Sequence, residues 1–131
     1  MDAPVLDRPL PRSGQPTTVA RDATRAFLHR AGRVRPPTQS GNDDAVLLVV
    51  GELVANAIRH TRGPASLPLE LNGDHIDIRV TDTSPDPPQP RPPHLDGTGG
   101  WGWRLIDHLS TDVHIERTPE GGKTICVRAP W

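Results

Sequence analysis

The sequence predicts an α+β fold, a two-layer sandwich with helices on one face of a mixed, largely antiparallel sheet. Apolar residues recur at helical spacing before about residue 60 and at a spacing of two after it. Helices therefore come first and strands follow, with one further helix among the strands, which is typical of α+β sandwiches. The length of 131 residues suits a single domain with one core.

Two helices are predicted in the first half of the chain. The first runs from a threonine cap, Thr17 or Thr18, to about Ala31, where Gly32 ends it. The second covers about residues 43–60 and has the clearest helical spacing in the chain. Its apolar stripe consists of Val46, Leu47, Val50, Leu53, Val54, Ala57 and Ile58.

The later segments read as strands because their apolar residues alternate. Residues 67–71 and 76–80 alternate on either side of an Asn-Gly-Asp turn, which predicts a hairpin. A short helix is predicted over residues 102–110. Strands are then expected around 113–115 and 125–127, joined by a Pro-Glu-Gly-Gly turn.

Two proline-rich segments interrupt this pattern. Residues 1–16 form an N-terminal segment with an edge strand expected around residues 5–10, and residues 17–131 form the main domain. A long loop over residues 83–99 follows the hairpin, and its length indicates either a functional role or disorder. Its PxxP spacings also fit a polyproline II ligand or a stiff connection.

The composition narrows the functional classes. A formal net charge of −1 speaks against electrostatic binding to nucleic acid or to a membrane surface. There is neither an apolar run of membrane-spanning length nor a signal-peptide pattern, so a cytoplasmic protein is expected. The single cysteine, Cys126, can form neither an internal disulfide nor a cysteine metal cluster.

The second predicted helix carries polar residues opposite its apolar stripe. Glu52, Asn56 and Arg59 share one patch, with His60 at its border. An amide oxygen can ligate Mg²⁺, a carboxylate can take a proton, and a cation can meet phosphate. The patch therefore fits a magnesium–phosphate site, although an ordinary solvated helix face carries the same residue types.

Asp82 stands at the end of the second hairpin strand, in phase with the buried positions. A carboxylate on the core side of a strand end needs a partner, and the exocyclic amine of a purine would serve. The alternative is a turn in which Asp82 bonds its own backbone.

Glycines cluster in "GTGGWGW", directly before the short predicted helix. Glycines let backbone N–H groups approach an anion, and the start of a helix adds a favourable dipole. Taken alone, a glycine-rich loop of this kind is weak support for phosphate binding.

In combination and in this order, "ELVANAIRHT", a strand ending in Asp82 and the loop with "GGWGWRLI" resemble the histidine-kinase-like ATPase (GHKL) superfamily. The sequence looks nearest to the branch of serine/threonine kinases that act as anti-sigma factors. The resemblance covers about residues 17–130. It implies the Bergerat-type ATP-binding fold, with residues 83–99 as the ATP lid.

The resemblance also implies roles for the residues on the second helix. Asn56 matches the asparagine that coordinates Mg²⁺ between the ATP phosphates, and Glu52 matches the general base. Arg59 matches a basic position that faces phosphate, and His60 matches the position beside the site.

Further roles are implied around the nucleotide. Asp82 matches the aspartate that recognises the adenine amino group, and Thr124 matches a late threonine near adenine. Gly100 and Gly102 match the glycines that wrap the phosphates. Trp101 and Trp103 stand among them, where the branch usually has a basic and an aliphatic residue. The first glycine box also departs from the family, since both of its usual glycines are missing after Asp82.

The implied function is an ATP- and Mg²⁺-dependent regulatory serine/threonine protein kinase. It would phosphorylate a small anti-anti-sigma (STAS-like) partner, sequester a sigma factor and form a homodimer. The altered glycine boxes favour an alternative, a non-catalytic module that binds its partner in a nucleotide-dependent way.

Overall fold

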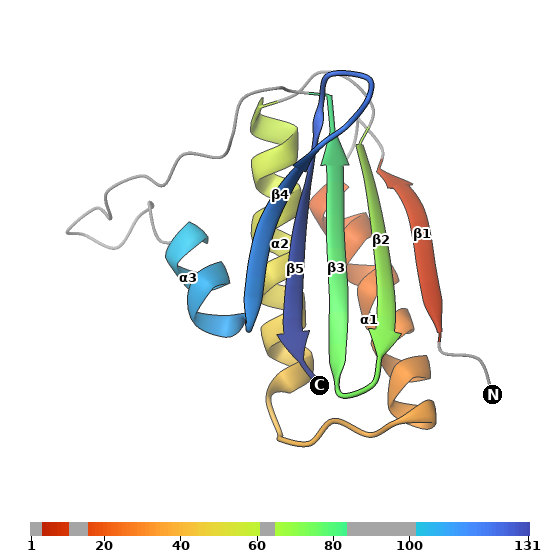
Figure 1. Ribbon diagram of the computed structural model, residues 1–131. Coiled ribbons are helices and arrows are strands. Elements are labelled where there is room, and N and C mark those ends of the chain that lie inside the picture. The colour runs from red at the N-terminus through yellow and green to blue at the C-terminus, as the bar shows by residue number, and fades with distance from the viewer. Residues whose placement is uncertain (1–3, 11–15, 61–64, 84–101) are drawn as a thin grey trace, which may run out of the picture.

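Helices and strands segregate into two layers in the computed structural model, which describes residues 4–10, 16–60, 65–83 and 102–131 (Figure 1). The elements in chain order are β1 (Val5–Leu10), α1 (Pro16–Val34), α2 (Asn42–His60), β2 (Ala65–Asn72), β3 (His75–Asp82), α3 (Gly102–Leu109), β4 (Asp112–Arg117) and β5 (Lys123–Pro130). The strands form one sheet in the order β1-β2-β3-β5-β4. Neighbouring strands pair antiparallel throughout, so the predicted α+β sandwich is confirmed, with a sheet that is antiparallel rather than mixed over its described strands.

Helix α1 extends beyond its predicted end. It begins at Pro16, whose missing amide hydrogen is no loss in the first turn, and it continues through Gly32 to Val34. The stop comes instead from Pro36 and Pro37, because the residue before a proline disfavours helical backbone angles. The prediction that Gly32 ends the helix was therefore wrong.

Helix α2 begins after Gly41, whose φ of 94° suits glycine, and it carries Asp43 and Asp44 in its first turn. Those carboxylates complement the positive end of the helix dipole. One face of the helix is fully buried through Val46, Val49, Val50, Leu53, Val54 and Ala57. Burial of each larger side chain contributes about 1.5–3 kcal/mol, so α2 is held firmly against the sheet.

The β2–β3 hairpin fixes which face of the sheet meets the helices. Asn72 pairs with His75 across a two-residue turn, where Gly73 has a φ of 61°. This register puts the predicted alternating residues on one buried face, and the hairpin prediction is confirmed. Those residues are Leu67, Leu69, Leu71, Ile76, Ile78 and Val80.

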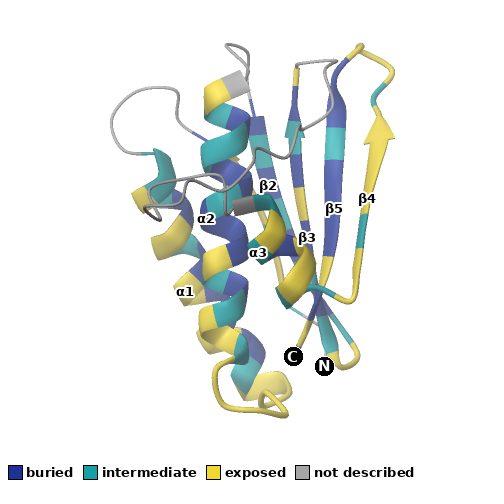
Figure 2. Cartoon of the chain, turned by 90° about the vertical axis from the view of Figure 1, so that its left-hand side faces the viewer, coloured by how far each residue is buried: buried dark blue, intermediate teal, exposed yellow. Residues whose placement is uncertain are grey.

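Trp131 connects the sheet to the linker between the two long helices. Its side chain is buried, and its indole N–H donates to the Arg35 carbonyl at 2.6 Å. The Trp131 carbonyl accepts bonds from the Thr38 amide and hydroxyl, at 2.8 and 2.7 Å. Seen from the side, α1 and α2 cover one face of the sheet only (Figure 2). None of the described helices is both long and apolar enough to cross a membrane.

Candidate functional site

The polar residues of α2 lie in its C-terminal half. Glu52 and Asn56 are half-buried, Arg59 is exposed, and His60 is the last residue of the helix. Glu52 and Asn56 are four residues apart, so one helical turn brings them to the same side of α2. The polar patch is thus partly covered at Glu52 and Asn56 and open to solvent at Arg59.

Asn56 has an unusual environment for an amide. Its Nδ2 atom is buried, and no hydrogen-bond acceptor for it exists among the residues that the structure describes. A buried donor without an acceptor costs about 1–3 kcal/mol, so such a group is rarely kept without a role. A side-chain amide offers an oxygen to a hard cation and a nitrogen that donates to an anion. Asn56 therefore fits a ligand that combines Mg²⁺ with phosphate.

Two strands reach the same end of the molecule as this half of α2. In Figure 1 the C-terminal ends of α2 and β3 and the beginning of β5 lie together at the top of the view. Helix α2 packs against both of these strands. Asp82 ends β3 and Lys123 begins β5, so both lie at the same end of the sheet.

Asp82 and Lys123 form an ion pair on the helix side of the sheet. They face each other in the β3–β5 register, and Lys123 Nζ lies 3.0 Å from Asp82 Oδ1. The exposed fractions of their side chains are 0% for Asp82 and 2% for Lys123. The predicted core-side orientation of Asp82 is observed, and its carboxylate contacts an ammonium group from within the chain.

Sequence reasoning missed Lys123, although a clue was available. Lys123 is in phase with Ile125 and Val127, both buried, and it is the single lysine of the chain. A charge on the core face of a strand requires a counter-charge, and Asp82 was already placed on that face. Because the alternation of each strand puts its charged residue on the core face, the two strands considered together would have predicted an ion pair between Asp82 and Lys123.

Gly122 brings the β4–β5 turn against the end of β3. A Cβ atom at this position would lie 2.1 Å from the Asp82 carbonyl oxygen and 3.0 Å from the Thr83 Cα. Only glycine fits between the two backbones. The Gly122 amide also donates to the Thr118 hydroxyl at 2.9 Å, which closes the turn. This glycine therefore sets the approach of Lys123 to Asp82.

Thr124, predicted near adenine, lies on the other face of the sheet. It alternates with the buried Lys123 and Ile125, and its hydroxyl is 2.8 Å from that of Thr81 on β3. The position that faces Asp82 is held by Lys123 instead.

The remaining predicted site residues belong to the lid and to α3. Gly102 is the first residue of α3, and Trp103 is half-buried against the core next to α2. Gly100 and Trp101 lie outside the described residues, as does the predicted lid apart from Thr83. Among the described residues, α2 therefore packs against the strands that carry Asp82 and Lys123 and against α3, which begins at Gly102.

Comparison with known proteins agrees with this fold. The chain is similar in structure to the histidine kinase domain of the Erythrobacter litoralis EL346 blue-light activated histidine kinase, with a TM-score of 0.50 and 14% sequence identity. The match covers 85% of this chain and 60% of that chain, so this chain spans less than two thirds of the structure it matches. A search of curated proteins found no match. A family model described as a histidine kinase-like ATPase domain matches residues 13–129. The chain therefore belongs to the histidine kinase-like ATPase domain family.

Proposed function

We propose that this protein binds ATP with Mg²⁺ at the α2 polar residues and acts as a regulatory serine/threonine protein kinase. Family membership supports ATP binding. The observation that carries the site is the buried Nδ2 of Asn56, which has no acceptor among the described residues. A metal-bound phosphate would supply the acceptor that this amide lacks.

Each polar residue of α2 has a role in this proposal. Asn56 ligates Mg²⁺ through its amide oxygen, and Arg59 offers an exposed cation to phosphate. Bound Mg²⁺ would offset the negative charge of the phosphates. Glu52, one turn before Asn56, would accept the proton of a partner's serine or threonine hydroxyl. A half-buried carboxylate beside solvent is suited to that transfer because it is both ordered and accessible.

The proposed partners follow from the resemblance of "ELVANAIRH" to the anti-sigma kinase branch. They are a small anti-anti-sigma (STAS-like) domain as phosphate acceptor and a sigma factor as the protein that is sequestered. A homodimer belongs to the same proposal.

A second candidate function is a nucleotide-dependent binding module without phosphotransfer. The Asp82–Lys123 ion pair favours it, because a carboxylate already bonded to an ammonium group is less available to an adenine amine. If the adenine base is recognised more weakly, contacts to the phosphates and Mg²⁺ would supply most of the binding free energy of ATP.

Calorimetric titration of ATP, with and without Mg²⁺, tests nucleotide binding. We expect Mg²⁺-dependent binding by the wild type and a loss of about tenfold or more in affinity in Asn56→Ala, since a hydrogen bond or ligand bond to a charged group is worth about 1.5–3 kcal/mol. Asn42→Ala is the matched control, because Asn42 begins the same helix at its other end. Absence of binding by a folded wild type would overturn the proposal.

Phosphotransfer to STAS-like domains from [γ-³²P]ATP separates the two candidate functions. Glu52→Gln should abolish transfer while keeping ATP affinity and partner binding. If the wild type binds ATP and a partner but transfers no phosphate, the kinase proposal is wrong and the binding module stands.

A further inference from the structure

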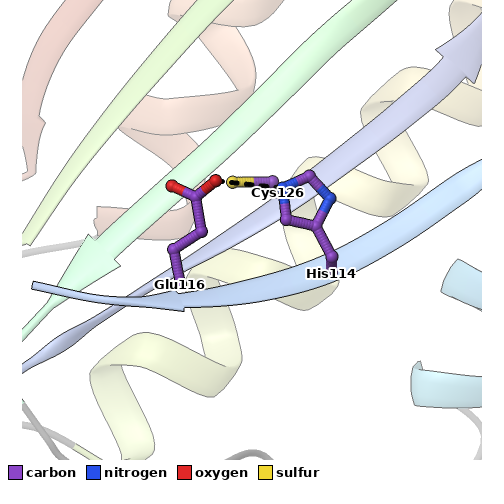
Figure 3. A group of neighbouring side chains, drawn as sticks. All are labelled: His114, Glu116 and Cys126. Carbon is purple, nitrogen blue, oxygen red and sulfur yellow. Dashed lines mark hydrogen bonds and ion pairs between the residues drawn. The ribbon is translucent and has the colours of Figure 1, made fainter.

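A group of metal-ligating side chains lies on the sheet face that the helices leave open. His114 and Glu116 project from β4, and Cys126 projects from the neighbouring β5 (Figure 3). One ligand atom from each of the three lies within 4.8 Å of the others. His114 and Cys126 are direct partners in the β4–β5 register, so the sheet itself holds them together. This face is opposite the one that α1 and α2 cover and that carries the Asp82–Lys123 pair.

The three atoms are close to the arrangement that a tetrahedral metal needs. Zinc bonds of about 2.0–2.3 Å to nitrogen, oxygen and sulfur place neighbouring ligands about 3.5 Å apart. His114 Nε2 and Glu116 Oε1 are already 3.3 Å apart. Both side chains are exposed, so packing against the core does not prevent them from turning toward an ion. Cys126 is buried, so its side chain has less freedom to move than the other two.

Asp112 contacts His114 at the ring nitrogen that does not face Glu116. Its Oδ2 is 3.1 Å from His114 Nδ1, which leaves Nε2 directed at Glu116. A carboxylate that accepts a hydrogen bond from the second nitrogen of a ligating histidine is the usual support of a zinc-bound imidazole. The same hydrogen bond to Asp112 is the main reason that the pKa of His114 is raised.

Charge also suits a divalent cation at this position. A thiolate and a carboxylate together balance a 2+ ion, and Arg79 on β3 lines the same recess as Cys126. Asp77 and Arg128 complete the charged surroundings and bond each other at 3.1 Å. The group borders a recess of about 80 Å³, which leaves room for a water molecule as a fourth ligand.

We propose that His114 Nε2, Glu116 and Cys126 Sγ form a zinc-binding site on the open face of the sheet, with Asp112 as the supporting carboxylate. The ligand set of one nitrogen, one oxygen and one sulfur atom selects Zn²⁺ over Mg²⁺ or Ca²⁺, which take oxygen ligands. Binding converts the Cys126 thiol to a thiolate and releases its proton. Burial raises the pKa of this thiol, so the metal must displace that proton.

The site is independent of the proposed nucleotide site, and its test needs no nucleotide. Metal-free protein, kept reduced, is titrated with Co²⁺ as a spectroscopic substitute for Zn²⁺. We expect one Co²⁺ per chain, a thiolate-to-cobalt charge-transfer band and visible bands typical of a tetrahedral site. Zn²⁺ should then abolish these bands by displacing Co²⁺. Because Cys126 is the single cysteine, any thiolate band reports this site alone.

Three variants and one control make the test specific. Cys126→Ser and His114→Ala should lose the charge-transfer band, and Asp112→Asn should bind about 10- to 100-fold more weakly. His29→Ala, which removes an exposed histidine on α1, should bind like the wild type. Circular dichroism verifies that each variant is folded. In wild-type protein, Zn²⁺ should also slow the reaction of Cys126 with a thiol reagent. Failure of the wild type to show the thiolate band, or an unchanged band in His114→Ala, would overturn the site.

Discussion

Asp82 and Lys123 illustrate how two neighbouring strands can bury a full charge pair. Each ion would lose several kcal/mol of hydration in a site without water, and the contact at 3.0 Å compensates only while both are present. The pair therefore adds less net stability than its geometry suggests, but removing one member takes the closest counter-charge away from the other, which stays buried.

Replacement of Lys123 alone should thus be strongly destabilising. We expect Lys123→Met to lower the free energy of unfolding by about 3–5 kcal/mol, because the buried Asp82 carboxylate then loses the ammonium group 3.0 Å away. The double change Lys123→Met with Asp82→Leu should recover most of that loss. Urea unfolding followed by circular dichroism measures both variants. Equal stability of Lys123→Met and the wild type would show that the charge of Asp82 does not depend on Lys123.

Among the described elements, the turn between β4 and β5 places a strict requirement on sequence at two glycines. Gly121 has a φ of 89°, and Gly122 faces the backbone of Asp82 with no room for a side chain. The turn therefore couples the start of β5 to the end of β3. A change in its shape would move Lys123 relative to Asp82.

Gly122→Ala should cost about 1–3 kcal/mol, the range of overpacked sites, because the Asp82 carbonyl must move away from the new methyl group. Thermal unfolding measures the effect. The matched control is Gly32→Ala in α1, where a Cβ atom meets nothing within 4 Å and alanine favours the helix. We expect the control to be neutral or slightly stabilising. Similar melting temperatures for both variants would contradict the close approach at Gly122.

At the scale of the whole molecule, the two layers meet through their apolar faces and are also tied at one end by Trp131. Its amide donates to the Asp74 carbonyl at 2.9 Å, in the β2–β3 turn, while its own carbonyl and indole bond the linker between α1 and α2. One residue thus contacts a hairpin turn and a helix connection that are distant in sequence.

Trp131→Ala should destabilise the fold by about 3–5 kcal/mol, the range for removing a buried aromatic side chain. Trp131→Phe keeps much of the apolar contact but removes the indole donor to Arg35, so we expect a smaller loss of about 1 kcal/mol. Denaturant unfolding of the two variants separates packing from hydrogen bonding. If Trp131→Phe lowers the free energy of unfolding as much as Trp131→Ala does, the indole hydrogen bond rather than apolar packing is the main contribution of this side chain.

The periodicity of apolar residues predicted the helix layer and the sheet well, because it depends only on the geometry within each helix or strand. The alternation around Leu69 and Ile78 and the stripe around Val50 each follow from which face of an element is buried. The Asp82–Lys123 contact joins residues 41 positions apart in sequence, and no local period contains it. The same holds for Gly122, whose constraint comes from a neighbouring strand. The end of α1 was mispredicted because Gly32 is tolerated inside a helix, whereas the prolines after it are not.

The buried ion pair also constrains how this sequence can change over time. Loss of about 3–5 kcal/mol is a large part of the 5–15 kcal/mol that stabilises an ordinary domain, so a lineage that alters only one of the two positions would produce a much less stable protein. A carboxylate free to recognise a base is therefore not one substitution away from this sequence. Positions 82 and 123 are instead expected to be inherited as a unit, changing together or not at all.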